Sequence, residues 1–431
     1  MKKYSRIFLI IFICLFAFNP AFFSQPSAKP NIVLILADDV GYEIPGYTGG
    51  TSYNTPHIDR LAETGMRFTN CHSTPKCAPS RVKMMTGRYM FRTTEEWGYI
   101  PPTEITFGHV LQSAGYAVAL AGKWQMSLLG NDPMHVRKMG FEQFCVFGWH
   151  EGPRYFDPYI WQNGVRRTDV SQLYGPDVFV DFLIDFISSH LNGPFFAYYP
   201  MALAHDISND FQPPPPPGPD GRYQTYRELI GYMDHNIGKL VATLDSLGLR
   251  ENTLILFSSD NGTPKEFITD IQNGEYIRTP ISSKMGDELI SGGKGLLTDR
   301  GTHVPLIANW PGQTPAGKIC SNLIDFSDFL PTLAELAGAA LPSDRVIDGR
   351  SFARQLRGKT GPARPWIYNQ FEGEGWIRTH RWKMYTDGRL YDMSSDPLER
   401  MAILPEADDD ASASIREQFG KALAELLSGP E

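Results

Sequence analysis

A continuous apolar run near the N-terminus limits the possible folds of this chain more than any other feature. The run is Asn31-Ile-Val-Leu-Ile-Leu-Ala37, and a strand of this kind has to be buried on both faces. Similar apolar segments recur along the chain, separated by stretches with helical spacing. The predicted strands cover 116–121, 195–199, 253–258 and 304–308, and the predicted helices cover 55–65, 106–115, 178–187, 226–247 and 325–336. This alternation predicts an α/β fold with a large, mainly parallel sheet sandwiched by helices.

The sequence changes character after about residue 340. Short segments rich in Trp and Tyr, such as Trp366-Ile-Tyr368 and Trp376-Ile-Arg378, precede a helical pattern that begins near Ala411. We therefore predict a main α/β domain over 29–340, followed by a small C-terminal antiparallel β-sheet plus helix subdomain over 341–431. The proline run 213–217 must be extended polyproline, which favours a stiff surface loop over a recognition motif.

Residues 1–28 have the pattern of a signal peptide. Lys2, Lys3 and Arg6 form a basic region, and the apolar segment from Ile7 to Phe18 follows it. A helix of that length spans only about 18 Å, which is too short for a bilayer core. We expect an exported protein, periplasmic or secreted, without a stable membrane anchor. A short uncleaved anchor is the alternative.

Charge and cysteine content narrow the classes further. The formal net charge is −8 and no basic run is present, which excludes nonspecific binding to nucleic acid. An anionic substrate would have to be bound by a few local cations. Beyond the signal segment the chain has four cysteines, an even number that in an exported protein is compatible with two disulfides, although a core of this size does not need them. These are Cys71, Cys77, Cys145 and Cys320.

Two pairs of oxygen-bearing side chains follow predicted strands. Asp38-Asp39 comes directly after the first apolar strand, and Asp260-Asn261 follows the strand over 253–258 by one residue. Ligands of open parallel sheets bind beyond the carboxyl ends of the strands, and an all-oxygen set suits Ca²⁺ or Mg²⁺. Asp and Asn are also common at strand ends as turn formers, so these pairs alone leave both interpretations open.

A third segment favours a catalytic site. Cys77-Ala-Pro-Ser-Arg81 begins a predicted helix that runs to Thr86, and a nucleophile there would face free N–H groups and the positive end of the helix dipole. With Thr86-Gly87-Arg88 after it, the segment resembles the signature of the formylglycine-dependent sulfatases, a family of the alkaline-phosphatase-like superfamily. The resemblance implies that a formylglycine-generating maturation enzyme oxidises Cys77 to an aldehyde, whose hydrated form attacks sulfur.

Further motifs extend the resemblance over nearly all of the chain after residue 28. They are Asn31–Asp39, Asn54–Leu61, Gly122-Lys-Trp124, Pro194–Phe196 with Ala204-His205, Ser259-Asp-Asn-Gly262, Gly292-Gly-Lys-Gly295 with Val304-Pro305 and Trp310–Gly312, and Leu390-Tyr-Asp392 with Asp396-Pro397. The resemblance implies two sulfate-binding lysines, one catalytic histidine and a divalent cation, Ca²⁺ or Mg²⁺. The lysines are Lys123 and Lys294, the histidine is His205, and the metal ligands are Asp38, Asp39, Cys77, Asp260 and Asn261.

The residue types suit these roles on chemical grounds. The negative charge of a sulfate monoester needs local neutralisation, which the cation and the two lysines provide. Arg81 lies one helical turn after Cys77, where its guanidinium can hold the nucleophile and a neighbouring carboxylate. His205 can protonate the departing alkoxide, because the ordinary pKa of histidine lies nearest neutral pH.

Two positions depart from the family pattern. The family usually has a histidine two residues after the first lysine, whereas this chain has Gln125, whose amide can hydrogen-bond but cannot accept a proton as a base. Thr302-His303 replaces the arginine that many members have before Val-Pro. We place Gln125 among the catalytic residues. Two roles are open: it orients the nucleophile, or its inability to act as a base slows turnover.

The predicted function is the hydrolysis of a sulfate ester, with a sulfated small molecule or glycan as the partner. Two alternatives are a phosphodiesterase or phosphonate hydrolase of the same superfamily, and a catalytically silent protein that binds sulfated glycans. An aromatic and basic stretch could line a sugar subsite, although core and surface roles suit its members equally well. It comprises Trp149, His150, Arg154, Tyr155, Trp161, Arg166 and Arg167.

Overall fold

The computed structural model describes residues 29–93, 98–208, 214–362 and 364–429. The predicted signal peptide and Pro213 of the proline run lie outside these residues. Among the residues described, no helix combines the length and the hydrophobicity needed to cross a bilayer.

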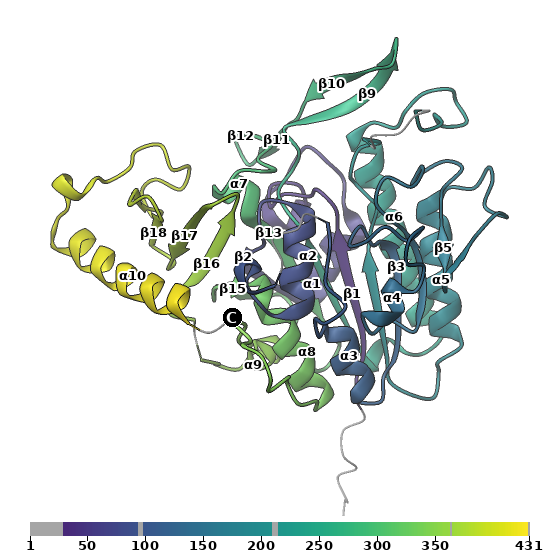
Figure 1. Ribbon diagram of the computed structural model, residues 1–431, viewed down its shortest axis with the longest axis horizontal. Coiled ribbons are helices and arrows are strands. Elements are labelled where there is room, and N and C mark those ends of the chain that lie inside the picture. Colours follow the sequence, from purple (N-terminus) through teal and green to yellow (C-terminus); the bar gives the residue numbers. More distant parts are fainter. Residues whose placement is uncertain (1–28, 94–97, 209–213, 363, 430–431) are drawn as a thin grey trace, which may run out of the picture.

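A single large sheet forms the centre of the molecule (Figure 1). It contains 11 strands, and its five central neighbours β8, β1, β7, β3 and β4 are all parallel. In spatial order the strands are β14 (Lys318–Cys320), β2 (Met66–His72), β13 (His303–Asn309), β8 (Thr253–Ser259), β1 (Asn31–Ala37), β7 (Phe195–Pro200), β3 (Ala117–Lys123), β4 (Gln143–Phe147), β5 (Trp161–Gln162) and β6 (Val165–Arg166), with β15 (Ile324–Asp325) paired to β2. The predicted mainly parallel α/β sheet is confirmed.

Helices cover both faces of this sheet, and alternate residues of β1 show why. Ile32, Leu34 and Leu36 join one apolar core, whereas Val33 and Ile35 join the other, and all five are fully buried. The first core includes residues of α2 (Cys77–Thr86), α3 (Phe107–Ser113), α4 (His135–Lys138), α8 (Phe329–Ala337) and α9 (Ala353–Leu356). The second includes residues of α1 (Pro56–Thr64), α5 (Gly175–Ser188) and α6 (Tyr226–Ser246).

The strand predicted over 304–308 differs in direction from the central five. This strand, β13, runs antiparallel to β8. The connection from β8 to β13 begins and ends at the same edge of the sheet, because the N–H of Gly262 donates to the carbonyl of Gly301 at 3.0 Å. No helix in this connection carries the chain back to the opposite edge. The chain must therefore re-enter the sheet in the reverse direction.

That connection contains two hairpins which the sequence analysis did not identify. They are β9 (Glu266–Gln272) with β10 (Glu275–Pro280), and β11 (Ser282–Met285) with β12 (Glu288–Ser291). Figure 1 shows the first hairpin extending away from the main sheet. Asn273-Gly274 forms its turn with φ of 52° and 82°, and an Asn-Gly pair between alternating segments is the sequence signal that would have predicted it.

The C-terminal part forms a separate four-stranded antiparallel sheet with one long helix beside it, as predicted (Figure 1). Its elements are β16 (Ile367–Phe371), β17 (Glu374–Arg378), β18 (Trp382–Tyr385), β19 (Leu390–Asp392) and α10 (Asp410–Ser428). Trp376 is fully buried in this sheet and donates a hydrogen bond through Nε1 to the carbonyl of Leu297 at 2.7 Å. The small sheet is thereby attached to the main domain.

A buried ion pair connects helix α2 with both parts of the molecule. Lys83 Nζ lies 2.7 Å from Asp325 Oδ2 and donates to the carbonyl of Tyr368, in β16, at 3.1 Å. The two charged side chains are only 1% and 0% exposed. Removing one member of such a pair leaves the other charge buried and uncompensated.

We therefore expect Lys83→Met to lower the free energy of unfolding by about 3–5 kcal/mol. Urea unfolding followed by circular dichroism measures the change. Lys421→Met is the matched control, because Lys421 pairs with Glu417 on the exposed face of α10 with 71% of its side chain accessible. The control should change stability by less than about 1 kcal/mol, and equal losses in both variants would contradict this account.

Candidate active site

Two adjacent parallel strands bring the predicted acidic residues together. Ala37, the last residue of β1, pairs with Ser259, the last residue of β8, so Asp38 and Asp260 leave the sheet at the same edge. The backbone N–H of Asp39 donates to Asp260 Oδ1 at 3.2 Å. Asn261 Nδ2 donates to Asp39 Oδ1 at 2.7 Å. These contacts place the two predicted pairs in one cluster, although 221 positions separate them in the sequence.

Helix α2 adds Cys77 to the cluster. The helix begins at Cys77 and ends at Thr86, as predicted, with Lys76 in an extended conformation before it. Potential metal-ligand atoms of Asp38, Cys77 and Asp260 lie within 4.8 Å of one another. Asp38 and Asp39 form a second such group with His205. The arrangement therefore offers carboxylates, an amide and a thiol around one point.

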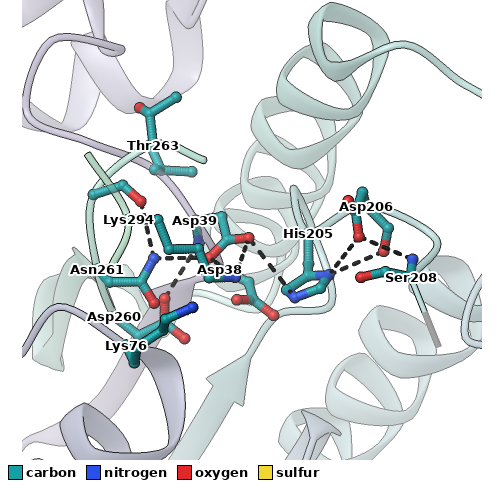
Figure 2. Close-up of polar contacts among 12 residues, drawn as sticks. Asp38, Asp39, Lys76, His205, Asp206, Ser208, Asp260, Asn261, Thr263 and Lys294 are labelled. Carbon is teal, nitrogen blue, oxygen red and sulfur yellow. Dashed lines mark hydrogen bonds and ion pairs between the residues drawn. The ribbon is translucent and has the colours of Figure 1, made fainter. Parts of the chain in front are cut away.

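Three cations compensate the buried carboxylates. Lys123 Nζ lies 2.6 Å from Asp38 Oδ2, and Lys294 Nζ lies 2.6 Å from Asp39. Arg81 donates through Nε and Nη2 to Asp260 Oδ2, at 2.9 and 2.6 Å. Figure 2 shows Lys294 and Asn261 on one side of Asp39 and His205 on the other.

The electrostatic balance differs between the two aspartates nearest Cys77. Burial by itself would raise the pKa of Asp38, but the nearby cations, Lys123 foremost, bring it well below its ordinary value. Burial and the adjacent Asp38 carboxylate raise the pKa of Asp260 to about 6, although Arg81 counteracts them. The site therefore contains more buried negative charge than its ion pairs fully stabilise.

The residues present fit a hard divalent cation. Asp38 Oδ1 and Asn261 Oδ1 are both buried, and neither has a hydrogen-bond partner among the described residues. Leaving a buried acceptor without a partner is costly. Oxygen atoms of this type are the preferred ligands of Ca²⁺ and Mg²⁺. Two such oxygens beside further carboxylates thus form an incomplete coordination shell that a cation would complete.

His205 reaches the site from the loop after β7. Its Nε2 lies 3.8 Å from Asp39 Oδ2, and its Nδ1 lies 3.0 Å from the backbone carbonyl of Asp206 and 3.3 Å from the Asp206 carboxylate. Burial and the ammonium of Lys294 lower the pKa of His205. Tyr155 holds the loop by donating to the carbonyl of Ala202 at 2.9 Å and also to that of His205.

Gln125 lies two residues beyond Lys123 at the end of β3. It is 4% exposed and has φ of 36°, a left-handed conformation that non-glycine residues seldom adopt. Within the described part of the chain its amide forms no hydrogen bond. Asp39 is also left-handed, with φ of 65°. Such backbone strain is concentrated at functional sites, where the surrounding structure enforces it.

The structure also identifies supporting residues that the sequence analysis did not name. Glu43 accepts a hydrogen bond from the hydroxyl of Thr263, whose carbonyl accepts one from the N–H of Lys294 at 2.9 Å. Tyr226 donates to the carbonyl of Asp39 at 2.7 Å. These residues hold the backbone near the acidic cluster. Nothing in their local sequence marks them, because their contacts join distant segments.

The aromatic and basic stretch 149–167 is only partly available to a ligand. Arg154 is 2% exposed and lies over the ring of Phe147, and Tyr155 is 5% exposed. Arg166 is exposed and lies 4.1 Å from the centroid of the Tyr159 ring. Both residues contact the loop that carries His205, Arg154 by donating to the carbonyl of Ser208 at 3.1 Å and Tyr155 by donating to that of Ala202. The described cysteines Cys71, Cys77, Cys145 and Cys320 are all free thiols.

Comparison with known proteins identifies the family of this chain. Residues 30–339 match the sequence model of the sulfatase family, and residues 293–428 match that of the C-terminal region of N-sulphoglucosamine sulphohydrolase. N-acetylgalactosamine-6-sulfatase of Canis lupus familiaris is 30% identical over 409 residues, covering 83% of this chain and 74% of that protein. Steryl-sulfatase of Mus musculus is 28% identical, covering 79% and 67%.

A solved structure shares the whole architecture. The structure of Ps i-CgsB superposes with a TM-score of 0.73 at 25% identity and covers 92% of each chain. That protein has also been solved in complex with k-i-k-neocarrahexaose. The family match spans the whole main sheet and every residue of the acidic cluster. The chain therefore belongs to the sulfatase family of the alkaline-phosphatase-like superfamily and is a sulfuric ester hydrolase.

Proposed function

We propose that this sulfatase is an exported enzyme that removes a sulfate ester from a carbohydrate, with formylglycine formed from Cys77 and with one divalent cation, Ca²⁺ or alternatively Mg²⁺. The observation that carries this proposal is the position of Cys77. It stands at the N-terminus of α2, within 4.8 Å of ligand atoms of Asp38 and Asp260, in a cluster that the cations of Arg81, Lys123 and Lys294 surround.

Formylglycine and the cation have distinct tasks. Hydrated formylglycine at position 77 supplies an oxygen nucleophile for sulfur, and the cation supplies positive charge against the sulfate oxygens. Asp38, Asp39, Asp260, Asn261 and the modified Cys77 would hold the cation. The sequence from Cys77 to Arg81 would be the segment that a maturation enzyme recognises.

The remaining charged residues act on the substrate and the nucleophile. We assign Lys123 and Lys294 to the peripheral oxygens of the sulfate, because both ammonium groups lie against the carboxylates that bracket the site. Arg81 fixes Asp260 through two hydrogen bonds and thereby orients a metal ligand. Gln125 is assigned a hydrogen bond to the nucleophile, without accepting its proton.

His205 is assigned the proton transfer to the leaving oxygen. Asp206 engages Nδ1, which leaves Nε2 directed toward Asp39 and the cluster. Departure of a sugar alkoxide requires a proton at the leaving oxygen, and a positioned acid contributes about 10²–10⁴-fold to such a step.

Support for a carbohydrate substrate comes from the relatives and from one aromatic and cationic pair of side chains. One relative is an N-acetylgalactosamine-6-sulfatase, and the structural neighbour Ps i-CgsB has been solved in complex with k-i-k-neocarrahexaose. The exposed Arg166 lies over the ring of the partly buried Tyr159, an aromatic and cationic pair of the kind that contacts sugars. Support for export comes from the signal-peptide pattern in residues 1–28.

A substrate panel tests this function directly. We expect sulfate release from at least one of a set of sulfated mono- and oligosaccharides that vary the sugar and the ester position, measured by ion chromatography. Matched phosphate esters, phosphodiesters and a steryl sulfate are the comparison substrates. Faster turnover of any of these than of every sulfated sugar would overturn the assignment.

The nucleophile can be identified by mass spectrometry. The peptide containing Cys77, from protein made in a host with a maturation enzyme, should have the mass of formylglycine. Cys77→Ala should abolish turnover and leave the thermal unfolding midpoint unchanged, because the side chain is small. Cys145→Ala, another buried free thiol, is the control and should retain activity. Full activity with an unmodified thiol at position 77 would refute the assignment.

The cation can be tested by removal and by mutation. Chelation, or Asp38→Ala, should lower kcat/KM at least about 100-fold, because several kcal/mol of transition-state stabilisation depend on the metal. Elemental analysis should find one divalent ion per chain in the active protein. Asp169→Ala, which removes an exposed acid paired with Arg167, should retain activity. Normal turnover by protein verified as metal-free would show that the assignment is wrong.

A further inference from the structure

Lys76 is a cation at the active site to which the sulfatase chemistry assigns no role. It directly precedes Cys77 and is half-buried. Its ammonium group interacts electrostatically with the charges of Lys294, Asp39 and Glu372. Figure 2 shows it among the residues of the acidic cluster. The sequence shows that Lys76 is adjacent to Cys77, but only the folded structure reveals which groups surround its side chain.

The side chain of Lys76 lies along the loop that carries Lys294. The N–H of Gly295 donates to the carbonyl of Pro75 at 2.8 Å, which joins the two loops. A Cβ atom added at Gly295, where φ is 84°, would lie 3.1 Å from Lys76 Cε and 3.6 Å from Nζ. The absence of a side chain at position 295 therefore leaves room for the lysine to reach over the loop toward the site.

Lys76 differs from the other cations of the site in its partners. Arg81, Lys123 and Lys294 each form an ion pair with an aspartate of the cluster. Within the described part of the chain, the ammonium group of Lys76 forms no hydrogen bond and no ion pair. Glu372, in the turn between β16 and β17, lies within electrostatic range but beyond ion-pair distance. The ammonium groups of Lys76 and Lys294 are neighbours, and of the two only Lys294 is paired with a carboxylate. Their combined positive charge favours an additional anion between or beside them.

We propose that Lys76 determines specificity by binding a second anionic group, a carboxylate or a further sulfate, on the same substrate molecule. This inference rests on the proposed function, since it assumes that the scissile sulfate occupies the site held by Lys123 and Lys294. The enzyme then prefers sugars with two negative groups to sugars with one. The chemical reason is that the scissile sulfate is already bound by these two lysines, whereas Lys76 has no anionic partner at ion-pair distance among the described residues.

The test compares two substrates and three variants. The substrates are a hexosamine monosulfate that the panel shows to be hydrolysed and the same sugar with a second sulfate. In the wild type, kcat/KM should be higher for the disulfated sugar. In Lys76→Gln the ratio of the two kcat/KM values should fall about tenfold or more, mainly through KM, which is the loss expected for one hydrogen bond to a charged group. Lys76→Arg should retain most of the preference.

Lys284→Gln is the matched control, because it removes the charge of an exposed lysine on β11 and should leave the ratio unchanged. An unchanged ratio in Lys76→Gln, or an equal loss for both substrates, would overturn the proposal. Calorimetric binding of both sugars to Cys77→Ala, with and without Lys76→Gln, gives the same comparison without turnover. Absence of sulfate release from every sugar would instead count against the proposed function. The binding comparison would then use the monosulfated hexosamine of the panel that binds Cys77→Ala most tightly and its disulfated counterpart, and an unchanged ratio of their affinities in Lys76→Gln would still overturn the role of Lys76.

Discussion

The compensation of buried carboxylates by buried cations is the interaction on which this site depends. Asp38 and Asp260 are fully buried at the carboxyl ends of β1 and β8, where each would be strongly unfavourable alone. Lys123 and Arg81 approach them from β3 and α2. Because four different elements contribute, the charges can be balanced only when the whole central sheet and its covering helix are assembled.

The same balance prepares the site for its ligands. The pairs satisfy one oxygen of Asp38 and leave the other without a partner, and the Asn261 oxygen is also free among the described residues. A cation would use these oxygens and change the partners available to the lysines. Structure and reactivity are thus linked, since the groups that compensate one another in this cluster are those that would contact a metal and a sulfate.

The connection between β8 and β13 contributes Lys294 to the site. It begins at Asp260-Asn261, leaves the sheet through two hairpins, and returns to place Lys294 against Asp39. Backbone hydrogen bonds from Gly293 and Lys294 to the carbonyl of Thr263 close the base of this excursion at 2.8 and 2.9 Å. The hairpins can therefore project outward without displacing the lysine, and the same loop lies under Lys76. Under the two proposals above, substrate selection and sulfate binding would both depend on this one segment.

The sequence by itself determined the α/β class, the helix at Cys77 and nearly every residue of the cluster. Each of these depends on a local signal: an apolar run buried on both faces, polar residues directly after a strand, or a cysteine motif at a helix start. The resemblance to a known family added the two lysines and His205, which no local pattern would have distinguished from surface residues.

The tertiary structure alone decided the direction of β13, the partner of each cation and the surroundings of Lys76. These features depend on contacts between segments that are distant in the sequence, 255 residues for Lys294 with Asp39 and 59 residues for Arg250 with Asn309 beside β8 and β13, and local sequence does not encode such contacts. Lys76 is the clearest case, because its sequence position next to Cys77 was evident, whereas its place over Gly295 and beside Lys294 arises only when two distant loops are joined by a backbone hydrogen bond. Sequence patterns record which faces are buried, but the pairing of buried charges is fixed by which elements the fold brings into contact.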